Sequence, residues 1–144
     1  MLDFLDKINV IAEKDYSYLM TNEVEPYLEK RRESRWFFSS DGKKLHCEAY
    51  TKLLSRGSII ILHGFTESAE KFREVAYYFR KAGYSVFAPD LRGHGKSHHD
   101  SDNPLRVDIE SFDTYAEDLN TFIEAVVKPS SQGKEIYIYS HSPR

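Results

Sequence analysis

The sequence predicts an α/β fold built around a partly parallel sheet. The first observation is the uninterrupted aliphatic run at residues 59–62, typical of a strand buried on both faces of a parallel sheet. The second is an amphipathic helical pattern at residues 68–82, and the third is an apolar strand pattern at residues 84–88. A strand, a helix and a strand in succession predict a right-handed crossover between two parallel strands.

The helix predicted at residues 68–82 has one apolar face, on which side chains recur with α-helical spacing (Phe72, Val75, Ala76 and Phe79). Ser68 is placed to cap its start, and Gly83 to follow its last turn. A second helical pattern covers residues 109–127, and the Pro129–Gly133 run is expected to break it. Residues 135–139 then predict a third sheet strand.

We expect two parts, an N-terminal helical extension at residues 1–31 and a partial α/β domain at residues 32–144. The extension is predicted to be helical in two pieces, with Thr21 and Asn22 as candidates for the break or for a cap and Pro26 in a first turn. Its acidic residues favour a packing or lid-like role over a membrane-surface helix. Residues 34–51 predict a β-hairpin, because an Asp-Gly pair separates two strand-like runs.

The composition excludes several classes of protein. The formal net charge is −3 and basic residues are scattered, so no nucleic acid partner is expected. No stretch approaches the ~18 apolar residues of a transmembrane segment, and the N-terminus lacks the apolar core of a signal peptide. The single cysteine, Cys47, is interpreted as a small strand residue in a reducing compartment, which predicts a cytoplasmic protein.

Polar loops follow each of the three predicted parallel strands, at residues 63–67, 90–97 and 140–142. Ligands bind at the carboxyl ends of strands in open α/β sheets, so these loops are the first candidates for chemistry. The Gly-Lys-Ser at residues 95–97 does not satisfy a phosphate loop, which needs glycine at position 90 and a helix immediately afterwards. His94, His98 and His99 lie on a glycine-rich loop with no fixed ligand geometry, so neither a metal nor a cofactor is predicted.

The three loops together resemble the α/β-hydrolase family, in particular its lysophospholipase and monoacylglycerol-lipase-like branch of serine hydrolases. The matching motifs are His-Gly-Phe-Thr-Glu at residues 63–67, Asp-Leu-Arg-Gly-His-Gly-Lys-Ser at residues 90–97, and Ser-His-Ser at residues 140–142. The resemblance implies the N-terminal half of an α/β-hydrolase fold, with a hairpin, parallel strands and flanking helices. It also implies a small lipid ester, a lysophospholipid or a monoacylglycerol, as the substrate.

The resemblance assigns roles to individual residues. Ser142 occupies the position of the nucleophile, at the turn that follows a strand. The backbone N–H of Phe65 would donate to the oxyanion, in a loop shaped by His63 and Gly64. The loop at residues 90–97 would support the site without a catalytic group.

The sequence departs from the family at the nucleophile turn. Pro143 occupies the second oxyanion-hole position but has no N–H to donate, and Arg144 replaces a glycine. The family's acid and base follow the nucleophile in chain order and are missing from these residues. We therefore expect a fragment truncated at the nucleophile turn and inactive as an esterase.

Two alternatives to ester hydrolysis stay open. One is a non-catalytic chain, either a pseudo-enzyme or a fragment that associates with a partner. The other is a different α/β-hydrolase chemistry, on amides or epoxides, because a fold does not fix a function. An unpaired strand at residues 135–139 would leave an exposed sheet edge, which invites self-association.

Overall fold

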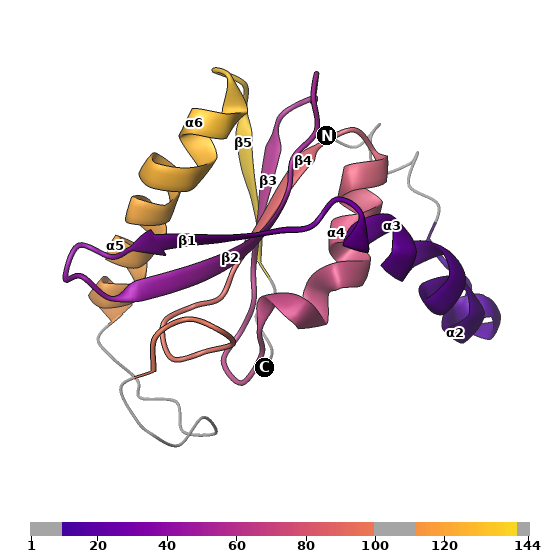
Figure 1. The fold of residues 1–144 in the computed structure, drawn as a ribbon, viewed down its shortest axis with the longest axis horizontal. Helices are drawn as coiled ribbons and strands as arrows, with labels where there is room; N and C mark the ends of the chain where they lie inside the picture. Colours follow the sequence, from indigo (N-terminus) through magenta and orange to yellow (C-terminus); the bar gives the residue numbers. More distant parts are fainter. Residues whose placement is uncertain (1–9, 100–111, 141–144) are drawn as a thin grey trace.

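The fold is a mixed five-stranded sheet with helices on both faces (Figure 1). The computed structural model describes residues 10–99 and 112–140. The strands are ordered β1-β2-β4-β3-β5 in the sheet. Their bounds are Glu33–Phe38 for β1, Lys44–Tyr50 for β2, Ser58–Leu62 for β3, Ser85–Pro89 for β4 and Ile136–Ser140 for β5. This arrangement confirms the predicted α/β class.

The sheet combines a hairpin with a parallel part. β1 pairs antiparallel with β2, and β2 pairs antiparallel with β4. β3 runs parallel to both of its neighbours, β4 and β5. The hairpin predicted at residues 34–51 and the parallel crossover from residue 59 to residue 88 are therefore both confirmed.

The helices form in three groups along the chain. The first runs through η1 (Glu13–Asp15), α2 (Tyr16–Leu19), η2 (Met20–Val24) and α3 (Glu25–Glu29). The second is η3 (Ala69–Phe72) with α4 (Arg73–Lys81), and the third is α5 (Phe112–Phe122), η4 (Ile123–Val127) and α6 (Lys128–Ser131). No helix in residues 10–99 or 112–140 is both long enough and apolar enough to cross a membrane.

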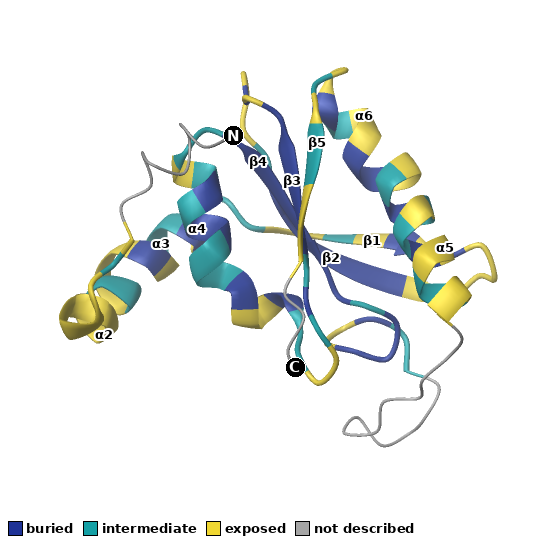
Figure 2. Cartoon of the chain, turned by 180° about the vertical axis from the view of Figure 1, so that it is seen from behind, coloured by how far each residue is buried: buried dark blue, intermediate teal, exposed yellow. Residues whose placement is uncertain are grey.

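The two faces of the sheet carry separate hydrophobic clusters. α3 and α4 cover one face, and the helix from α5 to α6 covers the other (Figure 1). Ile59 and Ile61 belong to the first cluster, whereas Ile60 between them belongs to the second. β3 is thus buried on both faces, as its aliphatic run predicts, and it appears dark in Figure 2.

β2 is buried in the same way as β3 and β4, whereas β5 is only partly buried. Cys47 is fully buried in β2, and burial raises the pKa of its thiol to about 12, which agrees with a packing role. β5 lies at the end of the strand order, and Ile138 and Tyr139 are among the exposed large apolar side chains. The exposed edge predicted for residues 135–139 is present in the described sheet.

One predicted helix break is wrong and another is confirmed. Thr21 and Asn22 lie inside the π-helical turn η2, and the helix continues through them into α3. The second helix ends at Ser131, with Gln132 in the left-handed region, so it ends inside the predicted run of residues 129–133, although Pro129 itself lies within α6. Pro26 and Pro129 are each the second residue of the helix that follows a π turn. A wider turn relieves the clash of a proline ring with the preceding carbonyl, so the helix can continue.

The second helical group ends as the sequence predicts. Gly83 has a φ of +103°, and the Gly83 N–H donates to Arg80 O while the Tyr84 N–H donates to Phe79 O. These two bonds are the pair of a Schellman motif, which satisfies the last carbonyls of a helix. The chain then enters β4 directly.

Candidate active site

The loops after β3, β4 and β5 begin at the same edge of the sheet. Leu62, the last residue of β3, is paired with Ser140, the last residue of β5. Pro89 ends β4, which lies on the other side of β3. Of the predicted site residues, Ser142 and Pro143 lie beyond β5, outside the described residues.

His63 joins the loop after β3 to the loop after β4. Its Nε2 lies 2.9 Å from the Leu91 nitrogen, and its Nδ1 lies 2.7 Å from Gly64 O. The Leu91 N–H donates, so Nε2 accepts, and Nδ1 carries the proton that Gly64 O accepts. Burial lowers the pKa of His63, in keeping with this neutral tautomer. Because both ring nitrogens are engaged, His63 shapes the loop and is not a free base.

The loop at residues 63–67 is closed by its own hydrogen bonds. The Gly64 N–H donates to Glu67 Oε1 at 2.8 Å, and the Glu67 N–H donates back to Gly64 O at 3.2 Å. Thr66 between them has a φ of +66°, an uncommon conformation for a β-branched residue. Glu67 also pairs with Lys71 one helical turn later, at 2.7 Å. The loop therefore has a defined shape.

Phe65 stands at the tip of this loop. Its side chain is 49% exposed, and its ring packs 5.9 Å from both the His94 and Tyr115 rings, measured between centroids. Among residues 10–99 and 112–140 the Phe65 N–H has no acceptor. A backbone donor free of partners is what an oxyanion position requires.

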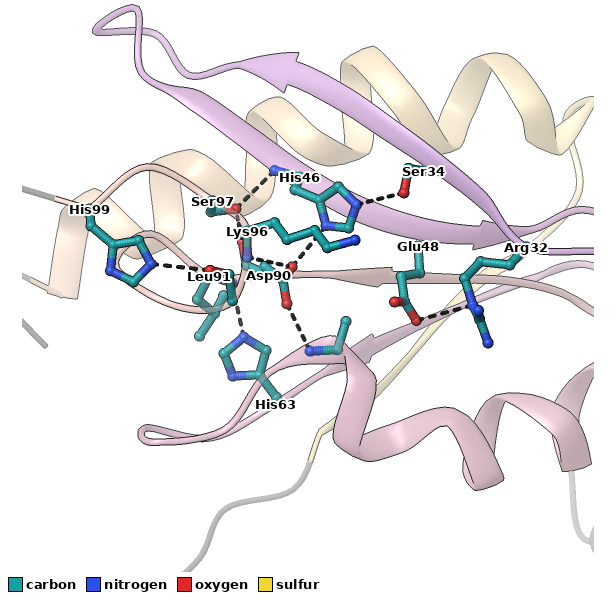
Figure 3. Close-up of polar contacts among 12 residues, drawn as sticks. Arg32, Ser34, His46, Glu48, His63, Asp90, Leu91, Lys96, Ser97 and His99 are labelled. Carbon is teal, nitrogen blue, oxygen red and sulfur yellow. Dashed lines mark hydrogen bonds and ion pairs between the residues drawn. The ribbon is translucent and has the colours of Figure 1, made fainter. Parts of the chain in front are cut away.

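Asp90 is the centre of the buried polar network (Figure 3). Its Oδ2 accepts a hydrogen bond from His46 Nδ1 at 2.8 Å and one from the Lys96 N–H at 3.1 Å. Its Oδ1 accepts the Ala69 N–H at 2.8 Å, and its carbonyl accepts the Ser97 hydroxyl at 2.6 Å. One residue thus connects β2, the start of the second helical group and its own loop.

The Asp90 carboxylate replaces the predicted capping interaction of Ser68. Ser68 occupies the N-cap position, as predicted, but its side chain makes no capping hydrogen bond. The Ala69 N–H is satisfied by Asp90 from the neighbouring strand end instead. Burial acts to raise the pKa of Asp90, but the bonds from His46, Ala69 and Lys96 outweigh it and hold that pKa below its usual value.

Gly95 is required by the same carboxylate. It has a φ of +51°, and a Cβ built on it would collide with the carboxyl group of Asp90. Gly93 also has a positive φ, +80°, but a Cβ there would meet no atom within 4 Å. Gly93 therefore meets a conformational requirement alone, whereas Gly95 also allows the close approach of the Asp90 carboxyl group.

Arg92 ties the loop to two further elements. Its guanidinium binds Asp118 of α5 through Nε and Nη2, both at 2.9 Å. It binds Asp41 of the hairpin turn through Nη1 at 2.9 Å and Nη2 at 2.8 Å. The hydrogen bonds to the Asp41 carboxylate, and then those to Asp118, raise the pKa of the buried Arg92. Two bidentate pairs fix its planar group.

The other histidines of the loop make separate contacts. His94 Nδ1 lies 2.9 Å from Arg92 O, and His99 Nε2 lies 3.1 Å from Gly95 O. Within the described ranges no three histidine, cysteine or acidic side chains are grouped to hold a metal ion.

Sequence reasoning missed His46, which lies 1% exposed on β2. His46 and Glu48 alternate with the apolar Leu45, Cys47 and Ala49 along that strand. Such alternation is typical of an antiparallel strand with one solvated face, yet every residue from Leu45 to Tyr50 is buried. A buried polar residue needs hydrogen-bond partners, and those of His46 are distant in sequence, so the local pattern does not predict them.

These features define an α/β hydrolase scaffold with its strand-end loops braced against one another. The sequence model of the family described as "Serine aminopeptidase, S33" matches residues 54–143, which is more than half of the chain. The chain belongs to this family of α/β hydrolases.

Curated relatives point to one branch of the family. Residues of this chain are 35% identical, over 68 positions, to the monoacylglycerol lipase of Mycolicibacterium smegmatis, covering 47% of this chain and 22% of the relative. They are 33% identical, over 84 positions, to lysophospholipase L2 of Escherichia coli K12, covering 58% and 24%. The chain thus spans about a quarter of the length of these relatives.

A solved structure shows the same partial correspondence. The α/β hydrolase from Novosphingobium aromaticivorans superposes with a TM-score of 0.57 at 30% identity. The match covers 75% of this chain and 34% of that structure. The matched part of this chain therefore corresponds to about a third of that hydrolase.

The contact between Gly95 and Asp90 predicts a difference between two glycine substitutions. Both Gly95→Ala and Gly93→Ala carry the cost of a positive φ, of order 1–3 kcal/mol. Only Gly95→Ala adds a collision with the buried Asp90 carboxylate, so we expect it to lower the free energy of unfolding more than Gly93→Ala does. Urea unfolding of both variants measures the difference. Equal losses of unfolding free energy would contradict the close contact between Gly95 and Asp90.

The Asp90 network predicts a loss of stability in acid. The pKa of Asp90 in the folded chain lies below the unfolded value of about 3.9. Its contribution to the free energy of unfolding is therefore complete above that pH. It is lost as the pH falls through the folded pKa. We expect Asp90→Asn to be less stable at neutral pH and to show a shallower decline from pH 5 downward. Parallel pH profiles for the two proteins would contradict this role.

Proposed function

We propose that this chain supplies the nucleophile position and one half of the oxyanion hole of a serine-dependent carboxylic ester hydrolase. The observation that carries the proposal is the pairing of Leu62 with Ser140 at the ends of β3 and β5. Ser142 follows Ser140 by two residues, and the loop with Phe65 follows Leu62; within residues 10–99 and 112–140 the Phe65 N–H has no acceptor. A serine beside a backbone donor is the core of acyl transfer by a nucleophilic serine.

The substrate class follows from the relatives. Two relatives with about a third of their aligned residues identical are a monoacylglycerol lipase and a lysophospholipase. Both names denote enzymes that act on a lipid with a single ester-linked chain. We propose a small lipid ester of this kind as the substrate. In the mechanism Ser142 Oγ attacks the ester carbonyl and the Phe65 N–H donates to the resulting oxyanion.

We further propose that Pro143 weakens this site. The residue after the nucleophile normally donates the second oxyanion hydrogen bond, and proline has no N–H. One such donor is worth about 10²–10³ in rate. The family order of the triad also puts its acid and base after the nucleophile, so residues 1–141 are not expected to supply them. His63 fits this expectation, because both of its ring nitrogens are already bonded.

A fluorophosphonate probe tests the proposal on the 144-residue chain. We expect slow labelling of Ser142, which Ser142→Ala abolishes. Pro143→Ala restores the N–H at position 143, so we expect labelling of Ser142 in that variant to be about 10²-fold faster. Peptide mapping by mass spectrometry identifies the labelled serine, and circular dichroism checks that each variant is folded.

Two outcomes would overturn parts of this account. If a folded chain shows no label at Ser142 even after Pro143→Ala, the non-catalytic alternative is correct. If Ser142 is labelled equally fast with either residue at position 143, the proline is not the defect.

A further inference from the structure

A serine, a histidine and an aspartate lie in one hydrogen-bonded line on the hairpin side of the sheet (Figure 3). Ser34 Oγ lies 3.0 Å from His46 Nε2, and His46 Nδ1 lies 2.8 Å from Asp90 Oδ2. These three residues come from β1, β2 and the end of β4. The line is separate from the Ser142 position, which follows β5.

The hydrogen bond to Asp90 fixes the role of one imidazole nitrogen, Nδ1. The Asp90 carboxylate also accepts the Ala69 and Lys96 N–H groups, so it is an acceptor and His46 Nδ1 carries the proton. When Nδ1 holds the only ring proton, Nε2 accepts the hydrogen bond from the Ser34 hydroxyl. A carboxylate that orients a histidine against a serine is the arrangement that activates a serine nucleophile, and it is recognised by geometry, whatever the chain order.

The members of this line differ in exposure in the way a nucleophile requires. His46 is 1% and Asp90 4% exposed, whereas Ser34 is exposed on β1, the edge strand of the sheet. Trp36 pairs with His46 across the hairpin, and its ring centroid lies 4.7 Å from that of the imidazole. The base is thus shielded from water while the hydroxyl remains accessible.

An apolar strip adjoins the Ser34 hydroxyl. Ser34, Trp36 and Phe38 alternate along β1, so their side chains project from the same face of the strand. Trp36 is 46% exposed and Phe38 is 64% exposed. Two partly exposed aromatic rings beside a hydroxyl provide a surface for a flat apolar group, such as the aryl part of an aryl ester.

We propose that Ser34, His46 and Asp90 form a second nucleophilic site, which takes acyl groups from aryl esters and phosphonyl groups from fluorophosphonates. With an aryl ester, Ser34 Oγ forms a bond to the carbonyl carbon and its proton passes to His46 Nε2. The bond from the carbonyl carbon to the aryloxy oxygen breaks, and the phenol leaves with that proton. With a fluorophosphonate, the phosphorus–fluorine bond breaks, fluoride leaves and the proton passes from His46 to solvent.

The strand limits what this site accelerates. Successive N–H groups of a β-strand point in opposite directions, so neighbouring amides of β1 cannot converge on one oxyanion. The loss of each oxyanion donor costs about 10²–10³ in rate. The site is therefore restricted to substrates whose leaving group is already a stable anion, which a phenolate or fluoride satisfies and an alkoxide of a lipid ester does not.

Ser40 provides a matched control for the experiment. It is an exposed serine of the same hairpin, and its hydroxyl donates to Glu117 at 2.6 Å with no histidine involved. We would treat the 144-residue chain with a fluorophosphonate and map the adducts by mass spectrometry in wild type, Ser34→Ala, Ser40→Ala and Ser142→Ala. General base catalysis contributes about 10²–10⁴ in rate, so we expect Ser34 to react at least ~10²-fold faster than Ser40.

The Ser34 adduct should persist in Ser40→Ala and Ser142→Ala and disappear in Ser34→Ala. It should also fall to the Ser40 rate in His46→Gln, if circular dichroism shows that variant to be folded. If His46→Gln unfolds, wild type in urea above its unfolding midpoint replaces it, and the two serines should there react equally. Equal reaction of Ser34 and Ser40 in the folded chain would overturn the proposal. Adducts at Ser34 and Ser142 fall in different peptides, so each proposal fails separately.

Discussion

The hydrogen bonds to the buried Asp90 carboxylate hold together the edge of the sheet at which β3, β4 and β5 end, here called the functional edge. They connect a strand of the hairpin through His46, the start of a helix through Ala69, and the loop through Lys96. Hydrogen bonds to charged groups contribute about 1.5–3 kcal/mol each, and a buried carboxylate left without them would be strongly destabilising. Each of these donors replaces a hydrogen bond that water would make to the Asp90 carboxylate, so removing one leaves the buried charge less well solvated.

Two further cross-links act in parallel with Asp90. Arg92 joins the same loop to the hairpin turn and to α5, and His63 joins it to the loop after β3. Each link leaves from the carboxyl end of β4, the strand between the hairpin and β3. The Phe65 N–H therefore stands on a loop that hydrogen bonds hold in place, so the proposed oxyanion donor would be preorganised.

Sequence reasoning succeeded where local pattern determines structure. The aliphatic run of β3, the Asp-Gly hairpin and the Schellman end at Gly83 all follow from periodicity or turn chemistry. It failed where a residue distant in sequence determines the local contact. Ser68 was expected to cap a helix, but the Ala69 N–H at that helix start donates to Asp90, which lies twenty-two positions after Ser68. The run at residues 129–133 ends its helix as expected, but the helix passes through Pro129 before it ends at Ser131. Motif resemblance identified the His63 loop and the Asp90 loop without revealing that His46 connects to the second.

Hydrogen exchange of two backbone amides tests the central role of Asp90 most directly. The Ala69 N–H is bonded to the buried carboxylate, whereas the Phe65 N–H has no acceptor in the described part of the chain. We expect the Ala69 amide to exchange only through global unfolding, and the Phe65 amide to exchange faster by orders of magnitude. If the Ala69 amide exchanges as quickly as that of Phe65 in the folded protein, Asp90 does not hold the functional edge together.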